Sequence, residues 1–231
     1  MAKIRMGVAV SAISGSVAGT TFSRNRGGAY MRNRSKPTVS TTTAAQNAKA
    51  RLALFSQSWQ GLTEAQRTSW KRWAGQNPVT DVLGDQRVLS GHQAYIGLNT
   101  RLHLIGQSAI SAPPIVAPPD GLLTVSVAVD IGTGDTEVTY TTTPLGAGDA
   151  LFLSGTLQDS AGVSYVKNQL RFFHVSSAAA ASPEDIETDL TSVFGTPVED
   201  QTFHLSAAVI DTATGLLSTP LFAKTVVVDS P

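Results

Sequence analysis

Residues 122–131 read Leu-Leu-Thr-Val-Ser-Val-Ala-Val-Asp-Ile, and this stretch decides the fold class of the second half of the chain. Apolar residues alternate with small or polar ones, which is the period-two pattern of a β-strand with one buried face. Gly132-Thr133-Gly134-Asp135 follows as a turn signal. The sequence therefore predicts an antiparallel β-domain from here on. The apolar positions are Leu123, Val125, Val127, Val129 and Ile131.

Downstream segments repeat this strand pattern. One helix is expected to interrupt them, with Ser182 as its cap, Pro183 in its first turn and Gly195 at its end. Short strands separated by turns are typical of an antiparallel β-sandwich of the immunoglobulin or fibronectin-III type. The chain has no cysteine, so the comparison concerns architecture alone. Strands are expected near 137–143, 150–157, 163–175, 203–209 and 221–228, with a hairpin loop at 211–215.

Upstream, the pattern is helical and predicts a small three-helix bundle. The first helix is expected over 43–62, from an apolar stripe at spacings of three and four residues. The second starts after Thr63 and the third after Ser90, because each has a glutamine three residues later that completes a capping box. Gly106 is expected to end the third helix. The stripe is Ala48, Leu52, Phe55, Trp59 and Leu62, and Trp59, Trp70 and Trp73 are expected to hold the bundle.

Residues 1–43 are predicted to be an extended basic arm. They are rich in Gly, Ser and Thr, contain no acid, and show no lasting helical period. Such a segment buries too little apolar surface to offset its ordering entropy. We expect it to be loose in isolation and to add a strand to a partner's sheet edge. The chain is thus interpreted as multidomain α+β, with a basic arm at 1–43, a helical docking domain at 44–106, a Pro-rich linker at 107–120 and a β-sandwich at 121–231.

The net charge of zero hides a strong asymmetry. Residues 1–119 hold 14 Lys or Arg against three acids, and residues 120–231 hold three Lys or Arg against 14 acids, giving +11 and −11. Such asymmetry indicates an N-terminal half that meets an anionic partner and a C-terminal half that stays in solvent.

Two interpretations of the basic arm remain open. It could dock on an acidic protein surface, including that of another copy of the chain, or it could track nucleic-acid phosphates. The Gly, Ser and Thr content and the β-forming pairs favour protein docking. The candidate partner-docking residues are Arg24, Arg26, Tyr30, Arg32, Arg34 and Lys36.

The sequence carries no motif for enzymatic chemistry. It lacks cysteine, a GxSxG elbow, a P-loop and a dinucleotide-binding loop. Asp130, Gly132, Gly134 and Asp135 resemble a calcium loop only loosely. We therefore expect no catalytic residue, no cofactor, no metal site and no small-molecule substrate. His92, His103, His174 and His204 are expected to be solvent-facing or structural.

Membrane and receptor functions find little support in the sequence. No window approaches 18 apolar residues, and Val8 to Val17 is too interrupted for a signal peptide. We expect no membrane partner. A receptor- or glycan-binding fibre module is a further alternative, and it would need an exposed aromatic patch. Four aromatic residues of the second half are expected to point mostly inward: Tyr140, Tyr165, Phe172 and Phe173.

Three stretches together resemble a family of phage and prophage proteins of unassigned activity. They are GSVAGTTFSRNRGGAYMRNRSKP at 15–37, TAAQNAKARLALFSQSWQGLTEAQRTSWKRWA at 43–74 and SGHQAYIGLNTRLHLIG at 90–106. The family combines a Gly-Arg arm, a W..LT..QR..W helical pair and a small β-domain. The resemblance covers about residues 1–119. It implies a structural, non-enzymatic component of a tailed-phage virion, made in the bacterial host cytoplasm: a capsid-decorating or head–tail/neck protein whose partners are other virion proteins and copies of itself.

Overall fold

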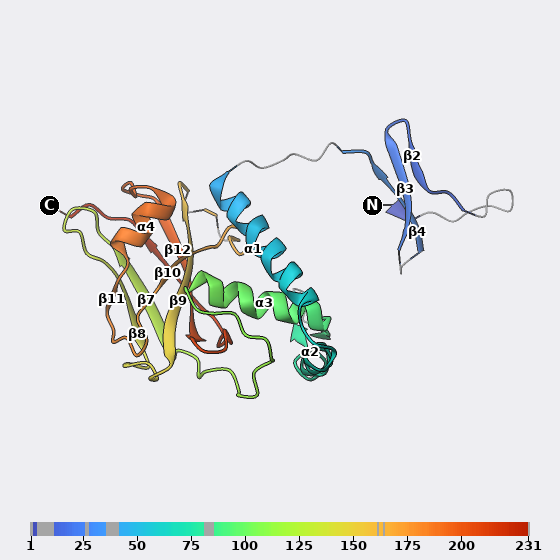
Figure 1. Ribbon diagram of the computed structural model, residues 1–231. Coiled ribbons are helices and arrows are strands. Elements are labelled where there is room, and N and C mark those ends of the chain that lie inside the picture. The colour runs from blue at the N-terminus through green and yellow to red at the C-terminus, as the bar shows by residue number, and fades with distance from the viewer. Residues whose placement is uncertain are drawn as a thin grey trace. The chain divides into compact units, whose positions relative to one another are not determined.

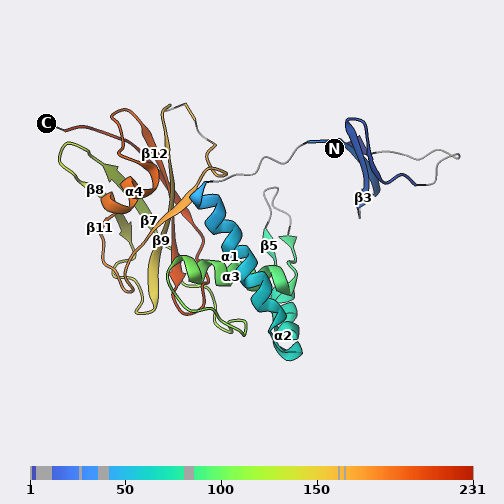
Figure 2. The ribbon, with the colours of Figure 1, turned by 45° about the horizontal axis from the view of Figure 1, so that its top comes forward.

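The chain is a mixed α+β protein with four helices and several antiparallel sheets in its described residues (Figures 1 and 2). The computed structural model describes residues 2–3, 12–25, 28–35, 42–80, 86–160, 162–163 and 165–230. It divides into two compact units, residues 1–48 and residues 49–231. The first unit is a small sheet, and the second contains most of the helices and the larger sheets.

The first unit is a four-stranded antiparallel sheet with the strand order β1-β4-β3-β2. The strands are β1 (Ala2–Lys3), β2 (Gly15–Val17), β3 (Thr20–Asn25) and β4 (Gly28–Asn33). The prediction that these residues are loose in isolation is therefore wrong. β-forming residues of neighbouring strands pair with each other, so the segment forms backbone hydrogen bonds within itself.

Three helices follow: α1 (Thr43–Gln60), α2 (Glu64–Gln76) and α3 (Gly91–Leu104). Both predicted capping boxes are confirmed, at Thr63 with Gln66 and at Ser90 with Gln93. The predicted stop at Gly106 is also confirmed, because Gly106 has a φ of +72° just after α3. Between α2 and α3 the chain forms a short pair of strands, β5 (Val79–Thr80) and β6 (Gln86–Arg87), which the sequence pattern did not indicate.

The three helices contribute to one buried cluster. Trp70 is 0% exposed, and its indole ring meets Trp73 and Tyr95 edge to face. The prediction that Leu52 belongs to the buried stripe of α1 is wrong, because Leu52 is 54% exposed. An apolar stripe predicts which face of a helix is buried but not how far along it the partner helices extend. The buried members are Phe55, Trp70, Ala74, Ala94, Tyr95, Leu98 and Leu216, with Trp59, Leu62 and Trp73 partly buried against them.

The Pro-rich segment is fastened to the helices where it begins. Asn99 is 0% exposed, donates to the Ile110 carbonyl and accepts from the Ile110 N–H. Trp70 Nε1 donates to the Ser111 carbonyl at 3.0 Å. Residues 110–111 are therefore held against α2 and α3 by buried polar side chains.

Two antiparallel sheets make up the rest of the second unit (Figure 1). One has the order β11-β8-β7 and the other β10-β9-β12-β13. The strands are β7 (Thr124–Val129), β8 (Thr136–Thr141), β9 (Asp149–Gln158), β10 (Arg171–Val175), β11 (Glu184–Asp185), β12 (Thr202–Asp211) and β13 (Leu221–Val226), and α4 (Glu187–Phe194) lies between β11 and β12 in sequence.

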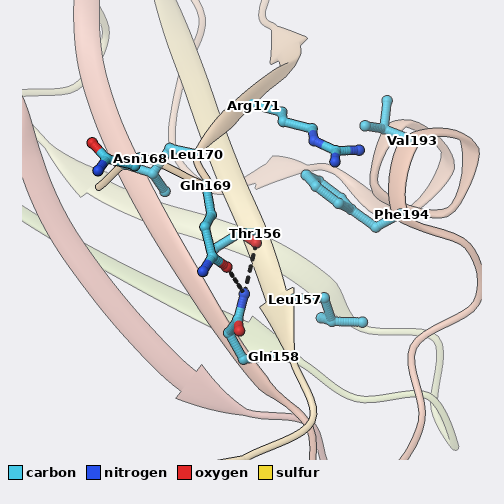
Figure 3. A pocket seen from close by; sticks show the side chains of 9 residues that line it. All are labelled: Thr156, Leu157, Gln158, Asn168, Gln169, Leu170, Arg171, Val193 and Phe194. Atoms are coloured by element: carbon cyan, nitrogen blue, oxygen red, sulfur yellow. Dashed lines mark hydrogen bonds between the residues drawn. The ribbon is translucent and has the colours of Figure 1, made fainter. Parts of the chain in front are cut away.

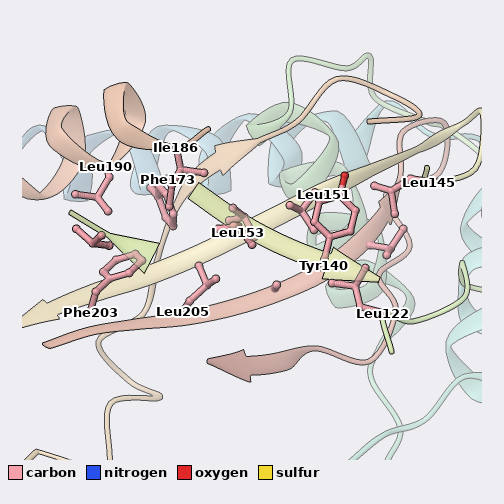
Figure 4. Close-up of a cluster of buried hydrophobic side chains, with 14 of the residues drawn as sticks. Leu122, Tyr140, Leu145, Leu151, Leu153, Phe173, Ile186, Leu190, Phe203 and Leu205 are labelled. Atoms are coloured by element: carbon pink, nitrogen blue, oxygen red, sulfur yellow. The ribbon is translucent and has the colours of Figure 1, made fainter. Parts of the chain in front are cut away.

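The two sheets share one apolar core (Figure 4). β12 shows how the strand pattern builds it, because Phe203, Leu205 and Ala207 are all at most 1% exposed and alternate along the strand. Val138 and Tyr140 of β8 enter the same core from the other sheet. In β8 and β12, alternate residues of the strand thus enter the core, as the period-two pattern predicts.

Two predicted boundaries in this half are wrong. The predicted strand at 163–175 is confined to β10, because residues 165–170 form a turn-containing connection. The inserted helix begins at Glu187 rather than at Pro183, because Glu184 and Asp185 pair with β8 instead. Its predicted end at Gly195 is confirmed.

The loop after β12 joins the sheets to the helices. Leu216 is 7% exposed and belongs to the helical cluster, and Arg101 donates to the Gly215 carbonyl at 3.5 Å. In Figures 1 and 2, α3 accordingly extends from α2, where it begins, to the sheets.

Candidate functional site

The β3–β4 hairpin carries the candidate docking residues that the structure describes. Its register pairs Thr20 with Asn33 at one end and Asn25 with Gly28 at the other. Directly paired residues of antiparallel strands lie on the same face, and successive residues alternate between faces. The register therefore assigns each side chain of the hairpin to one of two faces.

One face carries the apolar side chains of the hairpin, between the polar pair Thr20 and Asn33 at one end and Arg24 at the other. Phe22 pairs with Met31, and Arg24 pairs with Ala29 at the end of the same face. Val17 of β2 pairs with Thr20 and joins this face. Met31 is 40% exposed and Val17 is 67% exposed. We call Val17, Phe22, Ala29 and Met31 the apolar face of the N-terminal sheet.

The opposite face is polar and carries Tyr30 and Arg32. Tyr30 pairs with Ser23, and Arg32 pairs with Thr21. On this face the hydroxyls of Ser16 and Thr21 are hydrogen-bonded at 2.8 Å. The polar face thus offers hydroxyl groups and one arginine.

The predicted basic residues are therefore not on one surface. Arg24 and Arg32 lie on opposite faces of the hairpin, and Arg34 follows directly after β4, where its N–H donates to the Gly19 carbonyl. Arg26 and Lys36 lie outside the described residues. A run of cations in sequence is split in this way by the alternation of a strand. Their role in docking stays a prediction.

The N-terminal sheet lacks a core of its own in its described part. Every described side chain of β2, β3 and β4 is exposed or only partly buried. The buried hydrophobic residues of the described chain begin at Phe55. A sheet with an exposed apolar face gains stability when that face packs against another surface. The apolar face is therefore the part of this unit best suited to a partner.

A second feature, in the second unit, is a polar cavity of about 510 Å³ between β9, β10 and α4 (Figure 3). Gln158 donates to Thr156 Oγ1 at 3.0 Å and to Gln169 Oε1 on one side. Arg171, Val193 and Phe194 form the other side. The sequence pattern did not predict this cavity, because its residues come from separate segments between 156 and 194.

A third feature is a buried histidine held between two carboxylates. The register of β10 shifts between Phe172 and His174, and this bulge turns His174 toward β11 and α4. His174 Nδ1 lies 2.6 Å from Asp189 Oδ2, and Nε2 lies 3.2 Å from Glu184 Oε1. Only a protonated imidazole can donate to both carboxylates. These contacts link β10, β11 and α4, which indicates a structural role for His174.

The loosely calcium-like turn is engaged in backbone hydrogen bonds. Asp130 Oδ1 accepts from the N–H groups of Gly132, Thr133 and Ser230. Hydrogen bonds from Ser230, first, and from Gly132 and Thr133 lower the pKa of Asp130 from 3.8 to about 2. Within the described ranges, no group of three or more His, Asp or Glu side chains is placed to hold a metal ion.

None of the described helices is long and apolar enough to cross a membrane. Comparison of the chain with protein-family models, with curated proteins and with solved structures found no match. The phage resemblance therefore stays a prediction from residue patterns.

Proposed function

We propose that this chain is a non-enzymatic structural component of a tailed-phage virion, a capsid-decorating or head–tail/neck protein that docks through its N-terminal sheet. The observation that carries the docking part is the coreless sheet, a compact unit of its own with an exposed apolar face. The virion assignment itself is supported by the sequence resemblance. The proposed partners are other virion proteins and further copies of the chain.

The architecture fits this function. We propose that α1, α2 and α3 form a small bundle and that the two larger sheets form an immunoglobulin- or fibronectin-III-like sandwich with α4 inserted. The division of seven antiparallel strands into sheets of three and four supports the second point. The acidic residues 120–231 would then project into solvent while the N-terminal sheet holds the particle.

The energetics of docking favour the apolar face over the arginines. Full burial of a side chain such as Phe22 or Met31 contributes about 1.5–3 kcal/mol. An exposed ion pair made by Arg32 contributes at most about 1 kcal/mol and weakens with salt. Symmetry in a particle repeats each contact many times, so even a weak site holds firmly.

The nucleic-acid alternative draws less support from this geometry. Tracking a phosphate backbone requires cations along one surface, whereas Arg24 and Arg32 lie on opposite faces. If the alternative holds, binding of duplex DNA weakens with salt with a logarithmic slope near −0.9 for each neutralised phosphate. Absence of DNA binding at low salt removes it.

The test of the virion assignment is whether the chain is part of purified particles. Particles from a lysate of the host that carries the gene are banded on a density gradient, and their proteins are identified by mass spectrometry. We expect the chain in the particle band and slower trypsin cleavage after Arg24 there than in the free chain. A chain that stays in the soluble fraction contradicts the proposal.

Matched variants test which face docks. Phe22→Ser removes the largest side chain of the apolar face, and Thr21→Ser is its control on the opposite face. We expect Phe22→Ser to reduce incorporation into particles and Thr21→Ser to leave it unchanged. Equal incorporation of both variants contradicts docking through the apolar face.

A further inference from the structure

The outer face of the β10-β9-β12-β13 sheet carries a cavity that the docking function does not use. Phe203 and Leu205 of β12 face the core, so His204 between them faces outward. Val166, in the connection that leads to β10, is 9% exposed and lines the cavity together with His204. The cavity measures about 270 Å³ and lies against β12 and β13.

His204 is a buried polar group whose hydrogen bonding is incomplete. The residue is 8% exposed, and its Nε2 is buried without a hydrogen-bond partner. Buried polar atoms of native proteins are nearly always satisfied, so an unpaired one beside a cavity indicates a missing ligand group or water. His204 therefore brings an unsatisfied polar group to the wall of this cavity.

The chemistry of His204 favours a hydroxyl group as that partner. Burial, first, and the charge of Lys224, second, lower the pKa of His204 below its ordinary 6.5, while a hydrogen bond with the Val163 backbone opposes them. The imidazole is therefore neutral at pH 7, and each ring nitrogen either donates or accepts. A hydroxyl both donates and accepts, so it satisfies Nε2 in either tautomer.

The cavity is also flanked by two exposed aromatic rings. Tyr165 is 62% exposed and Phe222 is 60% exposed, and both line it. Within the described residues they are the two aromatic side chains among the large exposed hydrophobic residues. The prediction that Tyr165 points inward is therefore wrong, because its segment forms a loop rather than a strand. An exposed ring face is electron-rich and attracts the C–H groups of a ring that stacks on it.

Positive charge gathers at the same place. Residues 120–231 contain three cations, Lys167, Arg171 and Lys224, against 14 acids. Lys167 lines the cavity, and Lys224 is paired with His204 across β12 and β13. Cations placed together on an otherwise acidic domain favour an anionic ligand.

We propose that this cavity is a binding site for an acidic sugar residue, such as a uronic acid of an anionic polysaccharide. Tyr165 and Phe222 stack on the sugar ring, His204 bonds a ring hydroxyl, and Lys167 attracts the carboxylate. A cavity of 270 Å³ suits one or two sugar rings rather than a long chain. The site is independent of docking, since it lies in the second unit.

The experiment titrates the full chain with glucuronic-acid-containing oligosaccharides and with matched glucose oligosaccharides, followed by protein-observed NMR. We expect shifts confined to residues around the cavity, with the acidic series binding more tightly and its preference shrinking in high salt. Phe222→Ala and Tyr165→Ala should each weaken binding about tenfold. Leu123→Ala, which removes another exposed side chain at 76%, should not.

Two results overturn the proposal. One is the absence of saturable binding by the acidic series. The other is binding that Phe222→Ala and Tyr165→Ala leave at the level of Leu123→Ala. Lys167→Gln adds a separate readout, because it should remove the preference for acidic over neutral oligosaccharides while leaving the fold intact. A preference that survives Lys167→Gln unchanged contradicts the assigned role of the lysine. Presence or absence of the chain in particles decides the virion assignment and has no bearing on these titrations.

Discussion

Replacing Asn99 with leucine should loosen the junction between the helices and the Pro-rich segment. Asn99 is 0% exposed and makes three hydrogen bonds: Nδ2 to the Tyr95 carbonyl at 3.0 Å, Nδ2 to the Ile110 carbonyl at 3.2 Å, and Oδ1 from the Ile110 N–H at 2.7 Å. Leucine has a similar volume, so the change removes the bonds without opening a large cavity.

The magnitude follows from the groups left unpaired. The Tyr95 carbonyl keeps its partner within the helix, but both backbone groups of Ile110 lose theirs. Leaving a buried backbone group unsatisfied costs about 1–3 kcal/mol. Since Ile110 is only partly buried, water recovers part of that cost. We expect Asn99→Leu to lower the free energy of unfolding by about 2–4 kcal/mol.

The assay is urea unfolding followed by tryptophan fluorescence, because Trp70 donates to Ser111 beside this junction. Asn77→Leu is the matched control, since Asn77 is exposed and its side chain makes one bond, to the Trp73 carbonyl at 2.9 Å. We expect the control to change stability by less than about 1 kcal/mol. Equal effects of the two variants refute the argument that Asn99 fastens residue 110 to the helices.

Three further predictions concern the second unit. Gly215→Ala should lower the free energy of unfolding by about 1–3 kcal/mol, because a Cβ there would lie 2.9 Å from the Leu98 carbonyl oxygen. Gly134 has a positive φ as well, but a Cβ there would meet no other atom within 4 Å. Thermal unfolding of Gly215→Ala and Gly134→Ala therefore separates the cost of the steric contact from the cost of the backbone conformation. The pKa of Asp130 is depressed to about 2, so the ionised carboxylate stabilises the fold above about pH 4 and this stabilisation is lost as the pH falls toward 2. The urea midpoint of the unchanged chain should therefore fall between pH 5 and pH 2 by more than that of Asp130→Asn. Burial, first, and then the charges of Asp211 and Asp120 raise the pKa of Asp149, so its ionisation destabilises the fold as the pH rises above the ordinary value of 3.8. Asp149→Asn should therefore raise the melting temperature at pH 7 but not at pH 3. An equal rise at both pH values contradicts this prediction.

Local patterns in the sequence were sufficient for α1, α2 and α3 and for the strands β7, β8, β9, β12 and β13. The capping boxes at Thr63 and Ser90 are short-range hydrogen-bond motifs, so four residues suffice to predict where a helix begins. The same holds for the alternation in β12, whose odd-numbered residues enter the core. Trp70 could be predicted as a core residue because its stripe requires a buried face.

The arm and the candidate sites needed the tertiary structure. The sequence of residues 15–33 contains β-forming pairs, but whether they pair with each other or with a partner depends on which hydrogen bonds close, and only the register shows that Arg24 and Arg32 face opposite ways. Likewise, Tyr165, His204 and Phe222 lie far apart in the chain and meet because β12 and β13 pair beneath a loop. The sequence by itself thus determined the type of those elements whose capping motifs and periodicities are local, such as α2, α3, β7 and β12. The tertiary structure alone decided which faces are exposed and which distant side chains share a cavity, because strand register and loop placement depend on contacts between remote segments.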